Sequence, residues 1–255
     1  MFCVADVFAK VFVTVIMVNA TFEESMTSKA KKMEVIGQDI QAQMTQADNL
    51  LEKLMPPSVV EAMKAGKATG AEEYASVTIF FSGICNYNDL ANIYSAKEMI
   101  SCLDKLWKEY DFICKRWGIY RVETIGDTFL AVSGAPERAP DHAIQMTNFA
   151  LEVIRMVENF RTEGGDKILL KIGLCSGPIT AGVLGDSNPH WCVVGDTVNT
   201  ASRMYSTSKH GKVHVTEGTY KLISGSKLFK IEGPDKMNIK GKGSMDTYWV
   251  TGLVN

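Results

Sequence analysis

The sequence lacks an excess of charge of either sign, and it lacks cysteines at the spacing of a metal site. Its 27 Lys and Arg residues nearly balance 29 Asp and Glu residues, for a formal net charge of −2. A nearly neutral chain lacks the excess positive charge that attracts nucleic acid, so we expect no nucleic-acid partner. The six cysteines are scattered along 255 residues, which argues against a zinc site and against a disulfide framework. Free thiols in a reducing compartment are the simpler interpretation.

The sequence also lacks an unbroken apolar run long enough to cross a bilayer. Residues 2–18 are nearly all apolar, but Asp6, Lys10 and Thr14 interrupt them and would share one face of a helix. Such a helix would be about 25 Å long, slightly short of a ~30 Å hydrocarbon core. The alternatives are a truncated membrane span, a signal sequence and a buried helix. A signal sequence fits badly, because the charged residues lie within the apolar region and not before it.

Flanking charge favours a membrane helix over residues 1–22. Three lysines lie within residues 29–32, shortly after the apolar segment. Positive charge at this place is typical of the cytoplasmic side of a membrane. We therefore expect a membrane-attached protein whose downstream part lies in the cytoplasm.

A seven-residue repeat follows and predicts a coiled coil. The apolar residues of its seam are Met33, Ile40, Met44, Ala47, Leu51 and Leu54. Gly37 falls on this seam and weakens it, and Pro56 and Pro57 are expected to end the helix. An ordinary amphipathic helix that packs on its own domain is the alternative. We predict a coiled-coil signalling linker over residues 27–57.

Two long motifs carry most of the functional information. Residues 191–204 read WCVVGDTVNTASRM, and residues 121–134 read RVETIGDTFLAVSG. Over residues 74–252 the chain resembles the catalytic domain of class III nucleotidyl cyclases, and of guanylyl cyclases in particular. From residue 76 onward strands and helices alternate, which predicts an α+β sandwich with helices on one sheet. The resemblance implies a ferredoxin-like core with extra strands.

The metal-binding motif of the family is incomplete here. The cyclase reaction is an in-line displacement that suits two metal ions, Mg²⁺ or Mn²⁺, held by carboxylates. In the family these are the Asp of Phe-Ser-Asp-Ile and the Asp of Ile-Gly-Asp. Asp127 matches the second, but Gly83 stands in place of the first and offers no ligand. Asn86 also stands where the family usually has a Gly beside the triphosphate, and changing Gly83 to Asp is expected to restore the site if Asn86 is tolerated.

The remaining family residues are present and indicate GTP as the substrate. A carboxylate accepts from the N1 and N2 donors of guanine, and a thiol donates weakly to O6. Guanylyl cyclases use a Glu and a Cys for this, and the matching residues are Glu123 and Cys192. The resemblance assigns Asn199 to the ribose, Arg203 to charge on the transferring phosphate and Lys240 to the terminal phosphates.

These matches predict a division of labour between two subunits. In the family, one subunit supplies both metal carboxylates and the other supplies base recognition with the Asn, Arg and Lys. We therefore expect a heterodimer whose partner supplies the metal site. A homodimer with weakened metal binding and a catalytically silent regulatory or dimerisation subunit are the alternatives. Asn199 and Arg203 argue against the silent subunit, which needs neither.

A short motif in the apolar segment suggests what the membrane part belongs to. Residues 6–12, DVFAKVF, resemble the last helix of microbial rhodopsins. That family attaches retinal to the Lys, here Lys10, and uses the Asp one turn earlier, here Asp6, in its counterion. A membrane helix with a snorkelling Lys10 is the alternative. Rhodopsin–guanylyl cyclase fusions join these two modules in this order, and we expect retinal in the full-length protein alone.

Overall fold

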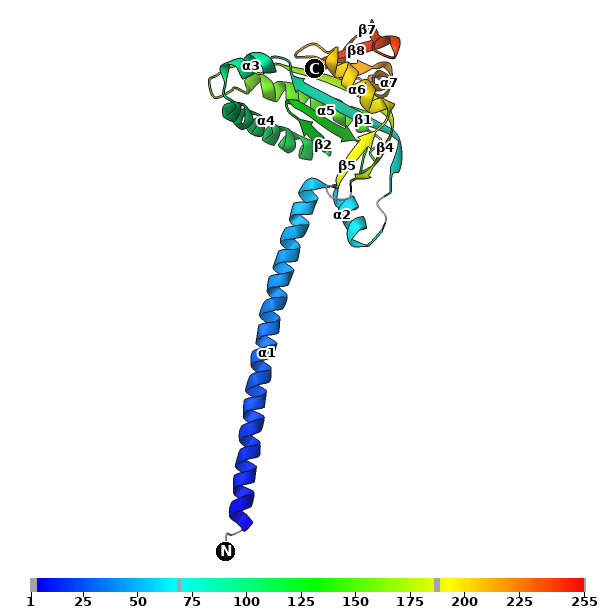
Figure 1. Cartoon of the computed structure of the whole chain (residues 1–255). Coiled ribbons are helices and arrows are strands. Elements are labelled where there is room, and N and C mark those ends of the chain that lie inside the picture. The colour runs from blue at the N-terminus through cyan, green and yellow to red at the C-terminus, as the bar shows by residue number, and fades with distance from the viewer. Residues whose placement is uncertain (1–3, 68–69, 186–188, 255) are drawn as a thin grey trace. The chain divides into compact units, whose positions relative to one another are not determined.

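The computed structural model describes residues 4–67, 70–185 and 189–254, without the side chains of residues 4–9 and 53. The chain divides into two compact units, with the boundary between Met55 and Pro56 (Figure 1). The N-terminal unit is a single helix, and the C-terminal unit carries the cyclase motifs. Each unit is described by itself.

Helix α1 spans Val4–Leu54, so one continuous helix of 51 residues contains both the apolar segment and the seven-residue repeat. The repeat's apolar side chains are solvent-exposed in the single chain: Met33 is 69%, Ile40 52% and Met44 57% exposed. Helix α1 ends at Leu54, ahead of the two prolines, and Pro57 occupies the first position of α2, Pro57–Lys64. Proline suits a first helical position, where its missing N–H leaves no bond unmade.

Across the described residues, we find no helix with the combination of length and apolarity that a bilayer crossing requires. Lys10 lies in α1, and its carbonyl oxygen accepts a hydrogen bond of 2.8 Å from the Thr14 hydroxyl. Asp6 is also in α1, but its side chain lies outside the described part.

Within the described part of the C-terminal unit, eight strands form one mixed sheet. The strand order is β2-β3-β1-β4-β6-β8-β7, with β5 paired to β4. Strands β4 and β6 run parallel, and the other pairs are antiparallel. The strands are β1 (Glu72–Ile84), β2 (Tyr120–Ile125), β3 (Thr128–Ser133), β4 (Leu170–Leu184), β5 (His190–Val194), β6 (Val213–Thr216), β7 (Phe229–Ile239) and β8 (Gly243–Leu253).

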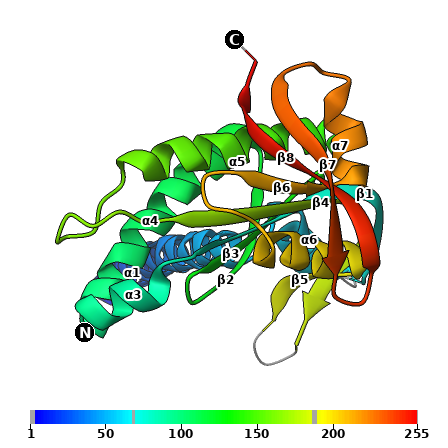
Figure 2. The ribbon, with the colours of Figure 1, turned by 90° about the horizontal axis from the view of Figure 1, so that it is seen from above.

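Helices cover both faces of this sheet, and the two faces have separate apolar cores. The helices are α3 (Tyr87–Ile93), α4 (Ala96–Trp117), α5 (His142–Asn159), α6 (Asp196–Ser206) and α7 (Glu217–Ser224). Phe80 of β1 packs in the core that α4, α5 and α7 share, and Ile79 packs in the core beneath α6. This alternation is the period of two expected for a strand buried on both faces. Figure 2 shows α5 and α6 on opposite sides of the strands. The expected α+β class with helices on one sheet is confirmed, and the helices lie on both faces of that sheet.

Local sequence signals account for the element ends that position the site. Helix α4 begins with a capping box between Ser95 and Glu98 and ends at Gly118, which has a left-handed φ of 63°. Strands β2 and β3 form a hairpin in which Ile125 faces Thr128, so Gly126 and Asp127 make the turn. Gly126 takes a φ of 60°, which glycine adopts without steric cost. The hairpin therefore places the Asp127 carboxylate at a strand end.

Candidate functional site

The two residues expected to read the base lie close together. Glu123 is on β2 and Cys192 on β5, and the two strands meet where Tyr120 packs edge-to-face on Trp191, with ring centroids 4.9 Å apart. Burial raises the pKa of the Cys192 thiol, and the Glu123 carboxylate raises it further. The thiol therefore stays protonated, the form that can donate a hydrogen bond, while Glu123 is exposed as an acceptor.

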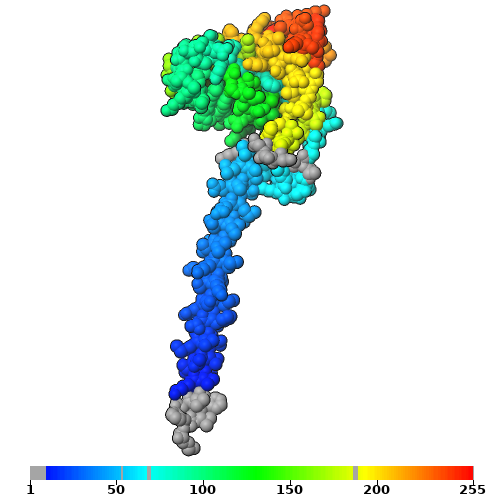
Figure 3. All heavy atoms as spheres, in the orientation of Figure 1, coloured from blue at the N-terminus to red at the C-terminus, as the bar shows by residue number. Residues whose placement is uncertain are grey.

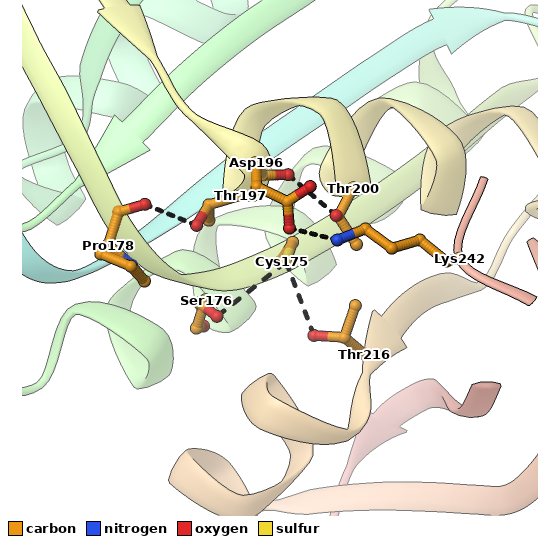
Figure 4. Close-up of polar contacts among 8 residues, drawn as sticks. All are labelled: Cys175, Ser176, Pro178, Asp196, Thr197, Thr200, Thr216 and Lys242. Atoms are coloured by element: carbon orange, nitrogen blue, oxygen red, sulfur yellow. Dashed lines mark hydrogen bonds and ion pairs between the residues drawn. The ribbon is translucent and has the colours of Figure 1, made fainter. Parts of the chain in front are cut away.

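Helix α6 carries Asn199 and Arg203 on one face, four residues apart. The helix is pressed closely onto β4, because a Cβ atom at Gly173 would lie 2.0 Å from the Tyr205 backbone nitrogen. At its start, the Thr197 hydroxyl donates to the Pro178 carbonyl at 2.6 Å (Figure 4). Asn199 is exposed and Arg203 half-buried, so α6 presents both polar side chains from a rigidly held position.

The turn between β7 and β8 folds against α6, and Figure 3 shows the orange surface of these strands next to the yellow surface of α6. A Cβ atom at Gly241 would lie 3.3 Å from the Arg203 Nη1 atom, so the turn backbone contacts the guanidinium. Lys242 forms an ion pair with Asp196 at the start of α6 (Figure 4). Lys240 is exposed. The structure therefore places two lysines in this turn, one as an anchor and one toward solvent.

The expected metal positions also meet, but they do not form a metal site. The Ile84 backbone N–H donates to the Asp127 Oδ2 atom at 3.0 Å, so this carboxylate lies beside the backbone of Gly83 and Ile84. Gly83 is buried and contributes no oxygen from a side chain. Among the described residues, no three His, Cys, Asp or Glu side chains gather in a way that could hold a metal. One carboxylate does not supply the hard-oxygen ligand set that Mg²⁺ or Mn²⁺ requires.

Asn86 has a structural role in this region. Its Nδ2 atom donates to the Lys167 carbonyl at 3.0 Å, and the Leu169 backbone N–H donates to its Oδ1 atom at 3.0 Å. Asn86 thus ties the start of α3 to the segment that leads into β4. This explains a polar residue at a position where the family usually has glycine.

Sequence reasoning missed Tyr205. A Cβ atom at Gly83 would lie 2.3 Å from its hydroxyl oxygen, so Tyr205 fills the space in front of the missing carboxylate. It follows directly after the motif of residues 191–204, but no local signal shows that it faces β1. The contact arises from the packing of α6 on the sheet.

Comparison with known proteins identifies a family for the C-terminal unit. A model of the adenylate and guanylate cyclase catalytic domain matches residues 69–252. The receptor-type guanylate cyclase gcy-28 of Caenorhabditis elegans is 38% identical over 217 residues, which are 84% of this chain and 17% of that protein. This chain spans 17% to 23% of the length of curated relatives such as this one.

Solved structures extend the likeness to fungal proteins. The guanylate cyclase domain of RhGC from Catenaria anguillulae, in complex with GTP, is 57% identical with a TM-score of 0.69, covering 72% of this chain and 100% of that one. A dimeric guanylyl cyclase domain of the RhoGC fusion protein from Blastocladiella emersonii is 53% identical with a TM-score of 0.67, covering 72% of this chain and 99% of that one.

Proposed function

Because the chain belongs to the adenylate and guanylate cyclase catalytic domain family and is homologous to enzymes named guanylate cyclase, we propose that it converts GTP to cyclic GMP and pyrophosphate as one subunit of a heterodimer. The observation that supports GTP as the substrate is the proximity of Glu123 and Cys192. Together they offer an acceptor for the N1 and N2 donors of guanine and a donor for O6. The GTP complex of the Catenaria domain supports the same substrate.

The α6 residues would act on the sugar and the phosphates. In the reaction the ribose 3′-oxygen attacks the α-phosphate and pyrophosphate leaves, so negative charge builds on the transferring group. Arg203 offers a planar set of donors for that charge, and Asn199, one turn earlier, would orient the ribose. Lys240 would bind the terminal phosphates from the β7–β8 turn. The contact of Gly241 with Arg203 keeps this turn next to the guanidinium.

A second subunit would complete the site. Glu123, Asn199 and Lys240 are all exposed in the single chain, as expected of residues that face a substrate held between two domains. The metal half of this chain does not fit a divalent cation, so the partner would bring the metal ions, Mg²⁺ or Mn²⁺, on its own carboxylates. The RhoGC domain, whose dimer is described as non-canonical, supports the pairing of two cyclase domains but not a particular arrangement of them. A homodimer with weakened metal binding is the first alternative.

A catalytically silent regulatory or dimerisation subunit is the second alternative. It would need a folded domain and an interface, but it would not need a guanine-reading pair or an arginine that faces a phosphate. Glu123 and Cys192 lie near each other on β2 and β5, and Arg203 lies on α6, which packs tightly on β4. This combination favours a catalytic contribution.

Helix α1 would connect the cyclase to a membrane module. The exposed apolar seam over residues 33–54 supports pairing with a second helix as a coiled coil. The apolar segment before it supports attachment to a membrane, with the cyclase on the cytoplasmic side. Its likeness to the last rhodopsin helix, with Lys10 as the retinal attachment site and Asp6 as counterion, fits one of the similar structures, the catalytic core of a rhodopsin-guanylyl cyclase.

The direct test is a cyclase assay of the full chain with GTP and Mg²⁺. The chain is assayed alone and after co-expression with a cyclase subunit that has both metal carboxylates. We expect cyclic GMP from the co-expressed pair and almost none from the chain alone. Equal rates per subunit in the two samples would contradict the heterodimer, and no product from either would favour the silent subunit.

A further inference from the structure

Gly83 on β1 faces α6, and its neighbour there is the ring of Tyr205. Residues 79 and 81 share this face with Gly83, because alternate residues of a strand point the same way. A Cβ atom at Gly83 would lie 2.3 Å from the Tyr205 hydroxyl oxygen, 2.8 Å from Cζ and 3.0 Å from Cε2. All three distances are shorter than van der Waals contact, so any side chain at residue 83 requires the tyrosine ring to move.

The backbone of Tyr205 has little freedom to retreat. The Cβ position of Gly173 on β4 is 2.0 Å from the Tyr205 backbone nitrogen and 2.6 Å from its Cα atom. The last turn of α6 therefore rests directly on the β4 backbone. Moving α6 away would open a core that includes the fully buried Ala201 and Met204. Relief of a clash at Gly83 must come from rotation of the Tyr205 side chain.

The Tyr205 hydroxyl lies near Thr128 and Asp127, which are neighbours on the β2–β3 hairpin. A phenol beside a single carboxylate is a poor ligand set for a hard divalent cation. The ring thus occupies the space and supplies no replacement charge.

We propose that Tyr205 is a second determinant that closes the metal half-site of this chain. Its phenol occupies the volume that a side chain at residue 83 would need. Two residues, Gly83 and Tyr205, therefore both act against metal binding. A carboxylate at residue 83 is then accommodated only when the Tyr205 side chain rotates away or is made smaller, and the smaller side chain removes the obstruction completely. The inference concerns this chain's own residues, and it rests on the proposed function only for the consequence that a partner brings the metal.

The first test measures Mn²⁺ binding by the full chain without nucleotide, from the electron paramagnetic resonance signal of free Mn²⁺. The variants are Gly83→Asp, Tyr205→Ala, and Gly83→Asp combined with Tyr205→Ala or with Tyr205→Phe. We expect the double variant with Ala to bind Mn²⁺ at least tenfold more tightly than Gly83→Asp alone. The Phe variant removes the hydroxyl but keeps Cζ, 2.8 Å from the Cβ position, so it should recover less. Equal affinity of Gly83→Asp and the Ala double variant, including no binding by either, would overturn the proposal.

A second measurement keeps the proposal testable if Gly83→Asp does not fold. Gly83→Ala introduces the same Cβ atom without a charge, and its effect on the midpoint of thermal unfolding is compared in two backgrounds. With Tyr205 present we expect a loss of roughly 3–10 °C, the usual scale of overpacking in a domain of this size. With Tyr205→Ala we expect less than half of that loss, because the obstructing ring is gone. Equal losses in both backgrounds would show that Tyr205 is not the obstruction. Neither readout depends on cyclase activity, so failure of the heterodimer model would leave both tests interpretable.

Discussion

The Glu123 carboxylate on β2 acts electrostatically on the Cys192 thiol on β5, although β2 pairs with β3 and β5 pairs with β4. The two side chains come from motifs separated by almost 70 residues of sequence, and the Tyr120–Trp191 ring contact joins their strands. Burial and the Glu123 carboxylate both raise the pKa of the thiol, so Cys192 keeps the proton that it would donate to guanine O6.

Exchange of this pair should change the substrate. Glu123→Lys combined with Cys192→Asp places a donor and an acceptor where adenine needs them, so the active complex should shift toward ATP. Hydrogen bonds to charged groups contribute about 1.5–3 kcal/mol each, so the ratio of kcat/KM for GTP and ATP should change by roughly tenfold or more. Cyclic GMP and cyclic AMP are measured in parallel. Equal use of both nucleotides by the unmodified complex would contradict the assignment.

Arg203 and Asp127 should contribute unequally in a heterodimer. Arg203→Ala in this chain removes charge stabilisation from the active site, and we expect a loss in kcat on the order of 10²-fold or more. Asp127→Asn keeps an acceptor for the Ile84 N–H and alters only the incomplete half-site, so its loss should be much smaller. Comparable losses in initial-rate assays of the two variants, each paired with the same metal-competent subunit, would argue against the division of labour.

The ion pair between Lys242 and Asp196 should matter for activity more than for stability. The Asp196 side chain is 72% exposed, and exposed pairs contribute about 0–1 kcal/mol to folding. Lys242→Ala should therefore change the free energy of unfolding by less than about 1 kcal/mol. It should still raise KM for GTP, because the turn that carries Lys240 loses its anchor to α6. Lys242→Arg is the matched control, and a KM unchanged by the alanine would show that the anchor is not needed.

Stability should fall in mild acid because of two buried histidines. Burial lowers the pKa of His142, whose ring lies 3.0 Å from the Ser76 hydroxyl and 2.7 Å from the Thr78 hydroxyl, and burial also lowers the pKa of His214. The unfolded chain then binds more protons than the folded one, so stability is complete above the unfolded pKa of about 6.5 and declines as pH falls below it.

Urea unfolding between pH 5 and pH 8 measures this decline. Each histidine contributes a slope of at most about 1.4 kcal/mol per pH unit. His142→Gln should be less stable at neutral pH but should show a shallower slope. A slope identical to that of the unmodified chain would exclude His142 as the titrating group.

Lys10 provides the test of the membrane module. If it carries retinal as a Schiff base, the full-length protein should form a visible pigment, and Lys10→Ala should abolish its absorption. The cyclase unit should stay folded, as circular dichroism can check, because Lys10 belongs to the other unit of the chain. An unchanged absorption spectrum in Lys10→Ala would exclude this residue as the attachment site.

Local sequence was sufficient for much of the fold. The end of α1 followed from Pro56 and Pro57, and the turn between β2 and β3 has a glycine at the residue that takes a positive φ, Gly126. These features depend on neighbouring residues, whose backbone preferences act over a few positions. The face of the sheet on which each helix lies did not follow, because apolar residues of a strand buried on both faces do not distinguish the two sides.

The sequence by itself determined the family and the absence of a carboxylate at residue 83, and it proposed Glu123 and Cys192 as the guanine-reading pair, because side-chain chemistry at a motif position is read directly. Tertiary structure alone decided that Tyr205 fills the space beside Gly83 and that Lys242, not Lys240, is tied to α6. Both are contacts between elements far apart in the chain. Their geometry depends on how closely α6 approaches the sheet, and that approach is set by the packing of the whole domain.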